Sequence, residues 1–201
     1  MLKLRLTKGE LRRQKEELTR FKRYLPMLQL KKKQLQLEIN KVQQNIENVN
    51  RQIEQIQQEV NSWVDLFAEY FPFSNFLRFV KVNTARENIA GVNIPVFLEV
   101  DFKEEKYDLF KTPLWVDKAI RVLKDMIIQS AKISVYHQQE EVLKEEFRIA
   151  TQRVNLFEKI KVPDAIENIR IIQIYIGELQ TAEVVRGKIA KSKIEKSKRS
   201  F

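Results

Sequence analysis

The stretch from Leu11 to Tyr70 reads LRRQKEELTRFKRYLPMLQLKKKQLQLEINKVQQNIENVNRQIEQIQQEVNSWVDLFAEY. Steps of alternately three and four residues from Leu11 give 18 positions, and 16 of them are apolar. At 43% hydrophobic composition, chance would place about eight apolar residues there. Because a narrow apolar stripe on a polar helix needs a second helix against it, the pattern predicts one half of a coiled coil. The apolar positions are Leu11, Leu18, Phe21, Leu25, Leu28, Leu35, Ile39, Val42, Ile46, Val49, Ile53, Ile56, Val60, Trp63, Phe67 and Tyr70.

The limits of this first helix follow from its flanking residues. Thr7 and Glu10 have the spacing of a capping box, in which Thr7 caps the helix and Glu10 reaches back to its amide. We expect the helix to start near Lys8, to continue with a kink through Pro26, and to end near Tyr70. About 60 residues at 1.5 Å each span roughly 90 Å, so the sequence predicts an elongated rod.

The next segment, 75–111, has strand periodicity in two places. Phe76–Val82 and Val92–Phe102 are rich in aromatic and β-branched residues. Pro95 restricts the second run to an edge strand or a bulge. We therefore expect a β-hairpin whose loop, Asn83–Ala90, is longer than the tight two-residue type. An isolated hairpin is marginally stable in water, so it should lie against the coiled coil or a partner.

A second apolar stripe follows the predicted hairpin. Thr112 and Pro113 have the residue types of an N-cap and a first helical turn. The three-four series then runs from Ala119 to Phe157, with ten of twelve positions apolar. Pro163 should interrupt this helix, and Asp164 could cap its restart. Beyond it the stripe continues, and further apolar residues suggest a helix covered on more than one side: Ile166, Ile169, Ile171, Ile172, Ile174, Tyr175, Ile176 and Leu179.

Two long helices joined by one compact connection must fold back on each other. The predicted fold class is all-α: a long antiparallel two-helix coiled coil with a short β-hairpin appendage between the helices. We expect residues 1–201 to form a single rod-like unit. Its parts are an N-terminal long helix over 7–74, the hairpin and connection over 75–111, a C-terminal long helix over 112–196 kinked near 163, and a basic tail over 197–201.

The net charge of +10 is concentrated at the two ends of the chain. Lys3–Lys33 carries 12 basic and 3 acidic residues, and Arg186–Arg199 carries 7 basic residues and one acidic residue. An antiparallel fold with residues near 11 beside residues near 180 would bring both segments to the same tip. That tip could be a solvated face, a nucleic-acid site, or an end inserted into a complementary protein cavity. Aromatic residues are not interleaved with its basic residues, which disfavours nucleic acid. The candidate partner-binding residues are Lys3, Arg5, Arg12, Arg13, Arg186, Lys188 and Lys191.

The residues that enzymes usually employ are scarce. The chain has no cysteine, and its one histidine, His137, fits a solvated helix position. No phosphate-binding glycine motif is present, and paired glutamates such as Glu140 and Glu141 fit an ion-paired helix surface. We therefore expect no catalytic, cofactor-binding or metal-binding residues and no enzymatic activity. No apolar run reaches the length of a membrane span or a signal peptide, so we expect a cytosolic protein.

Six segments resemble the D subunit of V-type and archaeal A-type rotary ATPases. They cover nearly the whole chain in order: Thr7–Lys15 (TKGELRRQK), Tyr24–Lys31 (YLPMLQLK), Ile89–Pro95 (IAGVNIP), Thr112–Trp115 (TPLW), Arg153–Pro163 (RVNLFEKIKVP) and Val185–Lys191 (VRGKIAK). Because the resemblance does not include the long C-terminus of eukaryotic members, we expect a bacterial or archaeal member.

The resemblance implies a non-catalytic rotor shaft in the central stalk of an ATPase or ATP synthase. It places both termini inside a hexamer of catalytic A and B subunits, and an F subunit on the shaft. It directs the hairpin end to the membrane ring through a connecting subunit. Such a shaft would couple ATP synthesis or hydrolysis to proton or sodium transport, in a peripheral complex on the cytoplasmic side of the membrane. The alternative is an autonomous coiled-coil tether or a basic nucleic-acid-binding rod.

Overall fold

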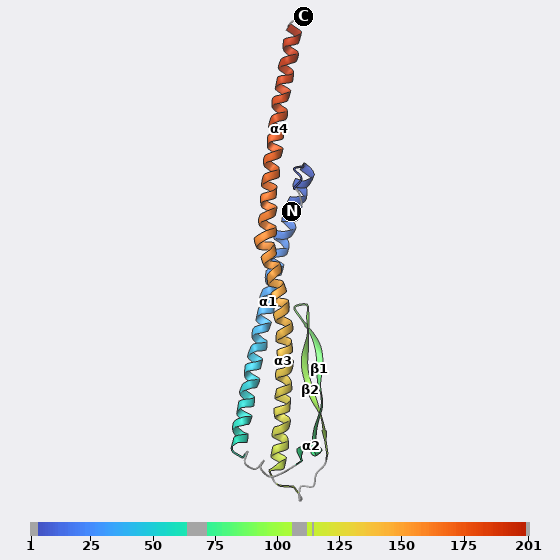
Figure 1. Cartoon of the computed structure of the whole chain (residues 1–201), viewed down its shortest axis with the longest axis vertical. Coiled ribbons are helices and arrows are strands. Elements are labelled where there is room, and N and C mark those ends of the chain that lie inside the picture. Colours follow the sequence, from blue (N-terminus) through green and yellow to red (C-terminus); the bar gives the residue numbers. More distant parts are fainter. Residues whose placement is uncertain (1–3, 64–71, 106–111, 114, 200–201) are drawn as a thin grey trace. The chain divides into compact units, whose positions relative to one another are not determined.

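A computed structural model describes residues 4–63, 72–105, 112–113 and 115–199 of the chain (Figure 1). It contains α1 (Lys8–Asn61), α2 (Phe73–Phe76), β1 (Leu77–Ile89), β2 (Val92–Glu104), α3 (Val116–Leu156), the π-helix η2 (Phe157–Lys161) and α4 (Val162–Arg199). Long helices with a two-stranded hairpin between them confirm the predicted fold class.

The chain falls into two compact units. The terminal unit comprises Met1–Leu30 and Ala150–Phe201, and the central unit comprises Lys31–Ile149. Each unit contains part of α1, so this helix is continuous across the division in sequence. The prediction of one rod-like unit stays a prediction.

The first helix starts and continues as its sequence predicts, but it ends earlier. The Thr7 hydroxyl oxygen accepts a hydrogen bond from the Glu10 amide at 3.2 Å, which is the expected N-cap. Pro26 lies inside α1 without ending it. The helix ends at Asn61, where Ser62 and Trp63 form a turn, and the rest of the predicted end, 64–70, lies outside the described residues. The Ser62 hydroxyl donates to the Glu59 carbonyl at 2.7 Å and so satisfies one of the last carbonyl groups of the helix.

In the central unit, α1 and α3 pack antiparallel along their predicted stripes. Leu35 and Leu143 are fully buried, and Ile39, Val42 and Val49 of the α1 stripe are buried as well. Three contacts fix the direction, because residue numbers fall along α3 as they rise along α1. Lys32 lies over the Phe147 ring, Gln43 donates to Glu140 at 2.8 Å, and Lys118 pairs with Glu59 at 2.8 Å. The predicted antiparallel pairing is confirmed here.

The hairpin has a tight turn, so the predicted long loop is wrong. β1 and β2 pair antiparallel from Leu77 opposite Glu104 to Ile89 opposite Val92, and only Ala90 and Gly91 lie between the strands. Both turn residues have positive φ, 53° and 78°, as a type I′ turn requires. The Asn88 side-chain oxygen accepts a hydrogen bond from the Gly91 amide at 3.1 Å. The sequence obscured this turn because Thr84–Asn88 is polar and lacks strand alternation.

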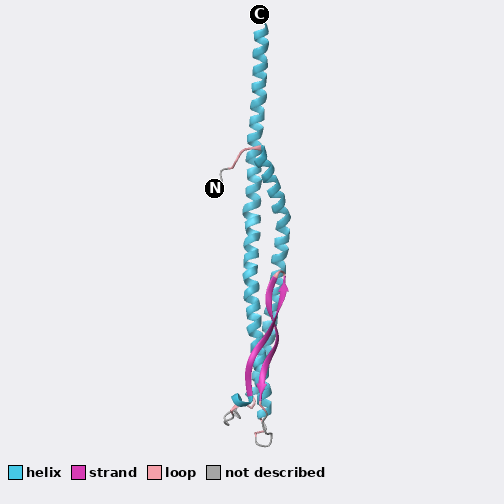
Figure 2. Cartoon of the chain, turned by 90° about the vertical axis from the view of Figure 1, so that its right-hand side faces the viewer, coloured by secondary structure: helices cyan, strands magenta, loops and turns pink. Residues whose placement is uncertain are grey.

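One side of the hairpin lies against α3 (Figure 2). Val92 and Ile94 are buried, and the buried Gln139 of α3 donates a hydrogen bond to the Pro95 carbonyl. Further along α3, the Lys132 ammonium lies 5.7 Å from the centre of the Phe97 ring, and Lys124 pairs with Glu104 at 2.7 Å. The hairpin is thus attached to its own helix, as expected of a two-stranded sheet that is marginal by itself.

The start of the second helical stretch differs from the prediction. Thr112 is not its N-cap, since the first helical residue is Val116. The Val116 amide bonds to the Pro113 carbonyl at 3.1 Å, and the Ala119 amide bonds to the Trp115 carbonyl at 3.0 Å. Pro113 therefore belongs to a turn that precedes the helix. The Trp115 ring packs on the Phe73 ring, with centroids 5.9 Å apart.

Pro163 perturbs the helix without interrupting it. The five residues before Val162 form the π-helix η2, and α4 continues directly from it. A proline ring clashes with the carbonyl four residues earlier, and a wider π turn makes room for it. Asp164 therefore lies inside α4, and its predicted role as the cap of a restarted helix is wrong.

Candidate functional site

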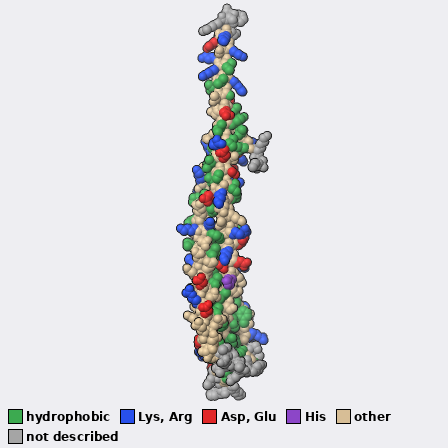
Figure 3. Space-filling model, turned by 60° about the vertical axis from the view of Figure 1, so that its left-hand side comes forward, with side chains coloured by type: hydrophobic (Ala, Val, Ile, Leu, Met, Phe, Trp, Pro, Cys, Tyr) green, Lys and Arg blue, Asp and Glu red, His purple; other side chains and the backbone are tan. Residues whose placement is uncertain are grey.

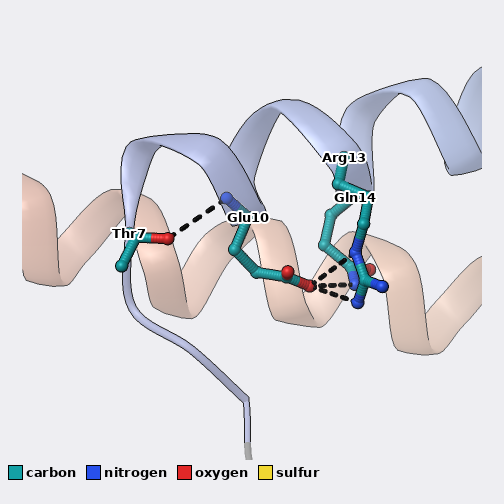
Figure 4. A network of polar contacts seen from close by, with 4 residues as sticks. All are labelled: Thr7, Glu10, Arg13 and Gln14. Carbon is teal, nitrogen blue, oxygen red and sulfur yellow. Dashed lines mark hydrogen bonds and ion pairs between the residues drawn. The ribbon is translucent and has the colours of Figure 1, made fainter.

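The start of α1 carries a small polar network (Figure 4). One carboxylate oxygen of Glu10 accepts hydrogen bonds from Arg13 at 2.7 and 3.2 Å and from Gln14 at 2.8 Å. The hydrogen bonds from Gln14 and then from Arg13 lower the pKa of the Glu10 carboxyl below its ordinary value. Gln14 occupies a stripe position and is only 6% exposed, so its amide needs this partner. The Glu10 side chain thus points along the helix, and the predicted return contact to the Thr7 amide is wrong.

A groove of about 820 Å³ lies beside this network in the terminal unit. Its walls carry three cations, Arg5, Arg13 and Lys161, and three anions, Glu10, Glu17 and Asp164. Because these charges balance, the groove has no net preference for an anionic or cationic ligand. It does show that the beginning of α1 lies beside residues 161–168, around the start of α4.

This placement corrects the predicted pairing of residues near 11 with residues near 180. Phe21 of α1 packs edge-to-face on Phe157, with ring centroids 5.4 Å apart, so the start of α1 is level with the start of α4. The prediction assumed that the first helix reaches Tyr70, whereas α1 ends at Asn61 and α3 begins at Val116. Because α1 is shorter than predicted, each of its residues lies beside an earlier residue of the second helical stretch than the prediction assumed.

As a result, α4 continues beyond the part of it that lies beside α1, as the orange-to-red end of the helix in Figure 1 shows. At 1.5 Å per residue, Arg186 is about 27 Å along α4 from Asn168 in the groove. The two basic segments therefore do not meet at one tip, and the prediction of a common tip is wrong. They form two separate basic regions, one from the start of the chain into α1 and one toward the end of α4.

The predicted partner-binding residues divide between these two regions. Arg5, Arg12 and Arg13 are exposed at the start of the chain, while Lys3 lies outside the described residues. Arg12 pairs with Glu16 at 2.9 Å and Arg13 with Glu10 at 2.7 Å, so part of their charge is neutralised locally. The three residues of the second region are exposed on α4, and no described residue forms an ion pair with them: Arg186, Lys188 and Lys191.

The end of α4 also exposes apolar side chains that were not among the predicted site residues. Figure 3 shows hydrophobic side chains between the lysines and arginines that project from this helix. Ile171, Ile174 and Tyr175 were expected to be covered on more than one side, yet they are exposed in this chain. So are Leu179, Val184, Val185, Ile189 and Ile194. The recurrence of apolar residues along this helix was the available signal, and exposed apolar patches of this kind mark interaction surfaces. Ile172 is still fully buried, so we call residues 173–196, which contain no buried residue, the free end of α4.

Metal ligands and membrane-spanning helices are the remaining candidates for a functional site. No group of three or more His, Cys, Asp or Glu side chains that could hold a metal ion occurs among the described residues. His137 is exposed, with its Nδ1 3.9 Å from a Glu140 carboxylate oxygen. In the described part of the chain, no helix combines the length and apolar character needed to cross a bilayer.

Comparisons with known proteins match most of the chain. Residues 10–192 match the family model that describes the D subunit of ATP synthase. A protein from Borreliella burgdorferi, named as the D subunit of a V-type ATP synthase, is 46% identical over 143 residues, which are 71% of each chain. A protein of the same name from Chlamydia felis is 31% identical over 148 residues, covering 70% of this chain and 71% of the relative.

Proposed function

Because the chain belongs to the family of ATP synthase D subunits, we propose that it is a rotor subunit in the central stalk of a V-type ATP synthase. In this role it transmits torque between a hexamer of catalytic A and B subunits and the membrane ring that translocates ions. ATP synthesis or hydrolysis is thereby coupled to proton or sodium transport.

The free end of α4 is the observation that carries this proposal. A single helix without a packing partner is marginal in water, because most helical stability in proteins comes from burial of one face. Here Ile174 is 48% exposed and Ile189 is 52% exposed. An apolar helix surface with unpaired basic residues suits insertion into a protein cavity, where the apolar side chains are covered and the charges meet acidic or carbonyl groups.

The charges of both basic regions favour exchangeable contacts with the surrounding subunits rather than a permanent interface. Exposed ion pairs contribute about 0–1 kcal/mol each, so contacts through them break and re-form easily. A rotor that turns inside a ring needs contacts of this kind. In the proposed arrangement the A and B subunits surround both basic regions, an F subunit binds the shaft, and a connecting subunit links the hairpin end to the membrane ring.

We further propose that the chain has no catalytic residues, and that ATP chemistry takes place on the A and B subunits. The chain then belongs to the peripheral sector of the complex on the cytoplasmic side of the membrane. Its contribution is mechanical: helices packed along continuous stripes resist bending and torsion while their exposed faces meet different neighbours.

Co-expression of the chain with A, B and F subunits from the same organism tests the proposal. Val185→Asp and Ile189→Asp place a charge on one apolar face of the free end, and we expect each to lower recovery of the chain in the A/B complex about tenfold. Gln180→Asp is the matched control, because 3.6 residues per turn put Gln180 on nearly the opposite face of the helix. Undiminished recovery of both apolar-face variants would contradict the proposal.

The same preparation distinguishes a rotor subunit from the alternative, a coiled-coil tether or a nucleic-acid-binding rod. A tether or nucleic-acid-binding protein would purify without A and B subunits and would bind duplex DNA with a steep salt dependence. A rotor should purify with A, B and F subunits. Neutralising Arg186, Lys188 and Lys191 together should then reduce coupled ATPase activity while assembly is retained. Unchanged coupling in that variant would mean that these charges only confer solubility.

A further inference from the structure

The two outer edges of the β-hairpin differ in what they contact. In a two-residue hairpin, the residues that flank the turn exchange hydrogen bonds, and the next pair points its backbone groups outward. Ile89 and Val92 flank the turn here. On β2 the outward groups therefore belong to Asn93, Pro95 and Phe97, and on β1 to Asn88, Arg86 and Thr84.

The outer edge of β2 is occupied. Pro95 has no amide hydrogen to leave unpaired, and its outward carbonyl accepts the hydrogen bond from Gln139 of α3. Phe97, the next outward residue, lies beneath the Lys132 ammonium of the same helix. The Pro95 carbonyl contact agrees with the alternation derived from the turn, and the Phe97 ring contact shows that the same strand lies against α3.

The outer edge of β1 is open over Thr84–Asn88. Thr84, Arg86 and Asn88 are not buried, and no described residue forms a backbone hydrogen bond with this edge. The two bulges of the hairpin lie outside the segment, between Phe79 and Lys81 and between Asn83 and Thr84. Thr84–Ile89 is thus a regular strand with unpaired amide and carbonyl groups, which is the template for addition of another strand.

The charge of this edge indicates which kind of strand can pair with it. Arg86 is at the centre of the open segment, and no described residue forms an ion pair with it, whereas Lys81 pairs with Asp101 at 3.7 Å and Lys124 with Glu104. Over its whole length β1 carries three basic residues and one acidic residue. A second copy of the chain would bring Arg86 close to its own counterpart, and like charges opposite each other destabilise a strand pair.

We propose that β1 binds an extended acidic segment of a partner protein by strand addition along Thr84–Asn88. The partner contributes a third strand to the sheet, and a carboxylate placed opposite Arg86 forms an ion pair with its guanidinium. This surface is separate from the free end of α4, so the proposal does not depend on the role assigned to that helix.

Hydrogen exchange on the full chain tests the geometry directly. The probe is a short blocked peptide in which glutamate alternates with valine. In the free chain, the amides of Thr84, Arg86 and Asn88 should exchange rapidly, while those of Ala85 and Glu87 are protected by the β1–β2 ladder. Saturating peptide should slow exchange at the first three amides only. Protection of all five amides without peptide, or none gained with it, would overturn the proposal.

Fluorescence anisotropy with the labelled peptide tests the chemistry. Arg86→Glu should weaken binding about tenfold or more, and a peptide with lysine in place of glutamate should not bind. Lys103→Glu is the matched control, since it makes the same charge change at an exposed position of β2 and should leave binding within about twofold. If both variants weakened peptide binding equally, the interaction would be general charge attraction, and a specific site at Arg86 would be contradicted.

Arg86→Pro removes an outward amide and leaves the ladder intact, just as Pro95 does at the paired position of β2. We expect it to abolish peptide binding while the amides of Ala85 and Glu87 stay protected. If the hairpin opens in this variant, Arg86→Gln and Arg86→Glu decide the question instead. Concentration-dependent dimerisation that Arg86→Pro abolishes would identify a second copy as the occupant and overturn the proposed partner.

Discussion

The central unit and the free end of α4 both carry recurring apolar residues along a helix, but only the central unit buries them. Between Leu35 and Val49 the stripe of α1 is closed by α3, and Leu35 is fully buried. Along residues 173–196 of α4 no side chain is buried, and Val185 is 49% exposed. One region has found its packing partner inside the chain, and the other has not.

Apolar periodicity in a helix therefore indicates that the helix needs a packing partner, but it does not indicate whether that partner lies in the same chain or in another protein. In the central unit the hydrophobic burial stabilises the chain itself. At the free end of α4 the same kind of surface stabilises nothing until another molecule covers it. Substitutions in the two regions should therefore separate folding stability from assembly.

The largest effect should come from proline in the buried stripe. Val49→Pro removes a helical hydrogen bond and displaces a buried side chain, and we expect it to destabilise the chain by about 3 kcal/mol or more. Val185→Pro should leave the main thermal transition unchanged and only reduce helical signal, since the free end supports no core. Circular dichroism melts of both variants compare them, and a similar loss of melting temperature in each would refute the distinction.

Truncation of an apolar side chain gives an intermediate effect. Leu143→Ala should destabilise the chain by about 2–5 kcal/mol, because it leaves a cavity between packed helices. Ile189→Ala should change stability by less than about 0.5 kcal/mol, as expected for an exposed position. Urea titrations measure both values. A cost for Ile189→Ala near that of Leu143→Ala would mean that the free end is already covered in the isolated chain.

The smallest effect concerns two acidic residues and the pH. Hydrogen bonds from Lys144 and Gln43 lower the pKa of Glu140 below its usual 4.5, and Arg170 similarly lowers the pKa of Glu167. A lowered pKa in the folded state stabilises the fold above the ordinary pKa, and this stabilisation is lost as the pH falls through the folded value. Only Glu140 joins two helices, through Gln43.

Glu140→Gln should therefore reduce stability at pH 7 by about 1 kcal/mol or less, and the difference from the wild-type chain should vanish toward pH 3. Glu167→Gln should leave the main transition unchanged at either pH, because its partner Arg170 lies on the same exposed helix. Thermal melts at both pH values make the comparison. A pH-independent loss in Glu140→Gln would trace the effect to packing and not to charge.

Much of the fold was predictable because it rests on local patterns. The three-four stripes predicted the long helices, Thr7 predicted the N-terminal cap, and β-branched residues predicted both strands. The errors lie at a turn and at helix ends, which apolar periodicity does not specify. The type I′ turn was missed because Thr84–Asn88 lacks strand alternation and because alanine, which occupies position 90, rarely adopts a positive φ. The helix predicted to reach Tyr70 ends at Asn61, and α3 begins at Val116, so the residues of α4 that lie beside the start of α1 differ from those predicted.

In the candidate site, too, some features were predictable from the sequence and others were not. The basic residues of both segments were evident in the sequence, but their common tip was not realised, because the level at which α1 and α4 meet depends on where α1 ends and α3 begins. The predicted stripe included the apolar residues of α4 as far as Leu179, but a stripe does not indicate whether its residues are exposed or buried. The open edge of β1 could be identified only from the turn geometry and the Gln139–Pro95 contact together.

The sequence by itself determined that this protein consists of long helices that need packing partners, with a hairpin between them and basic ends. Periodicity and charge are properties of the chain, so folding cannot alter them. The tertiary structure alone decided which stripe finds its partner within the chain and which strand edge stays open. Those outcomes depend on helix ends and strand register, where a shift of a few residues changes which side chains meet.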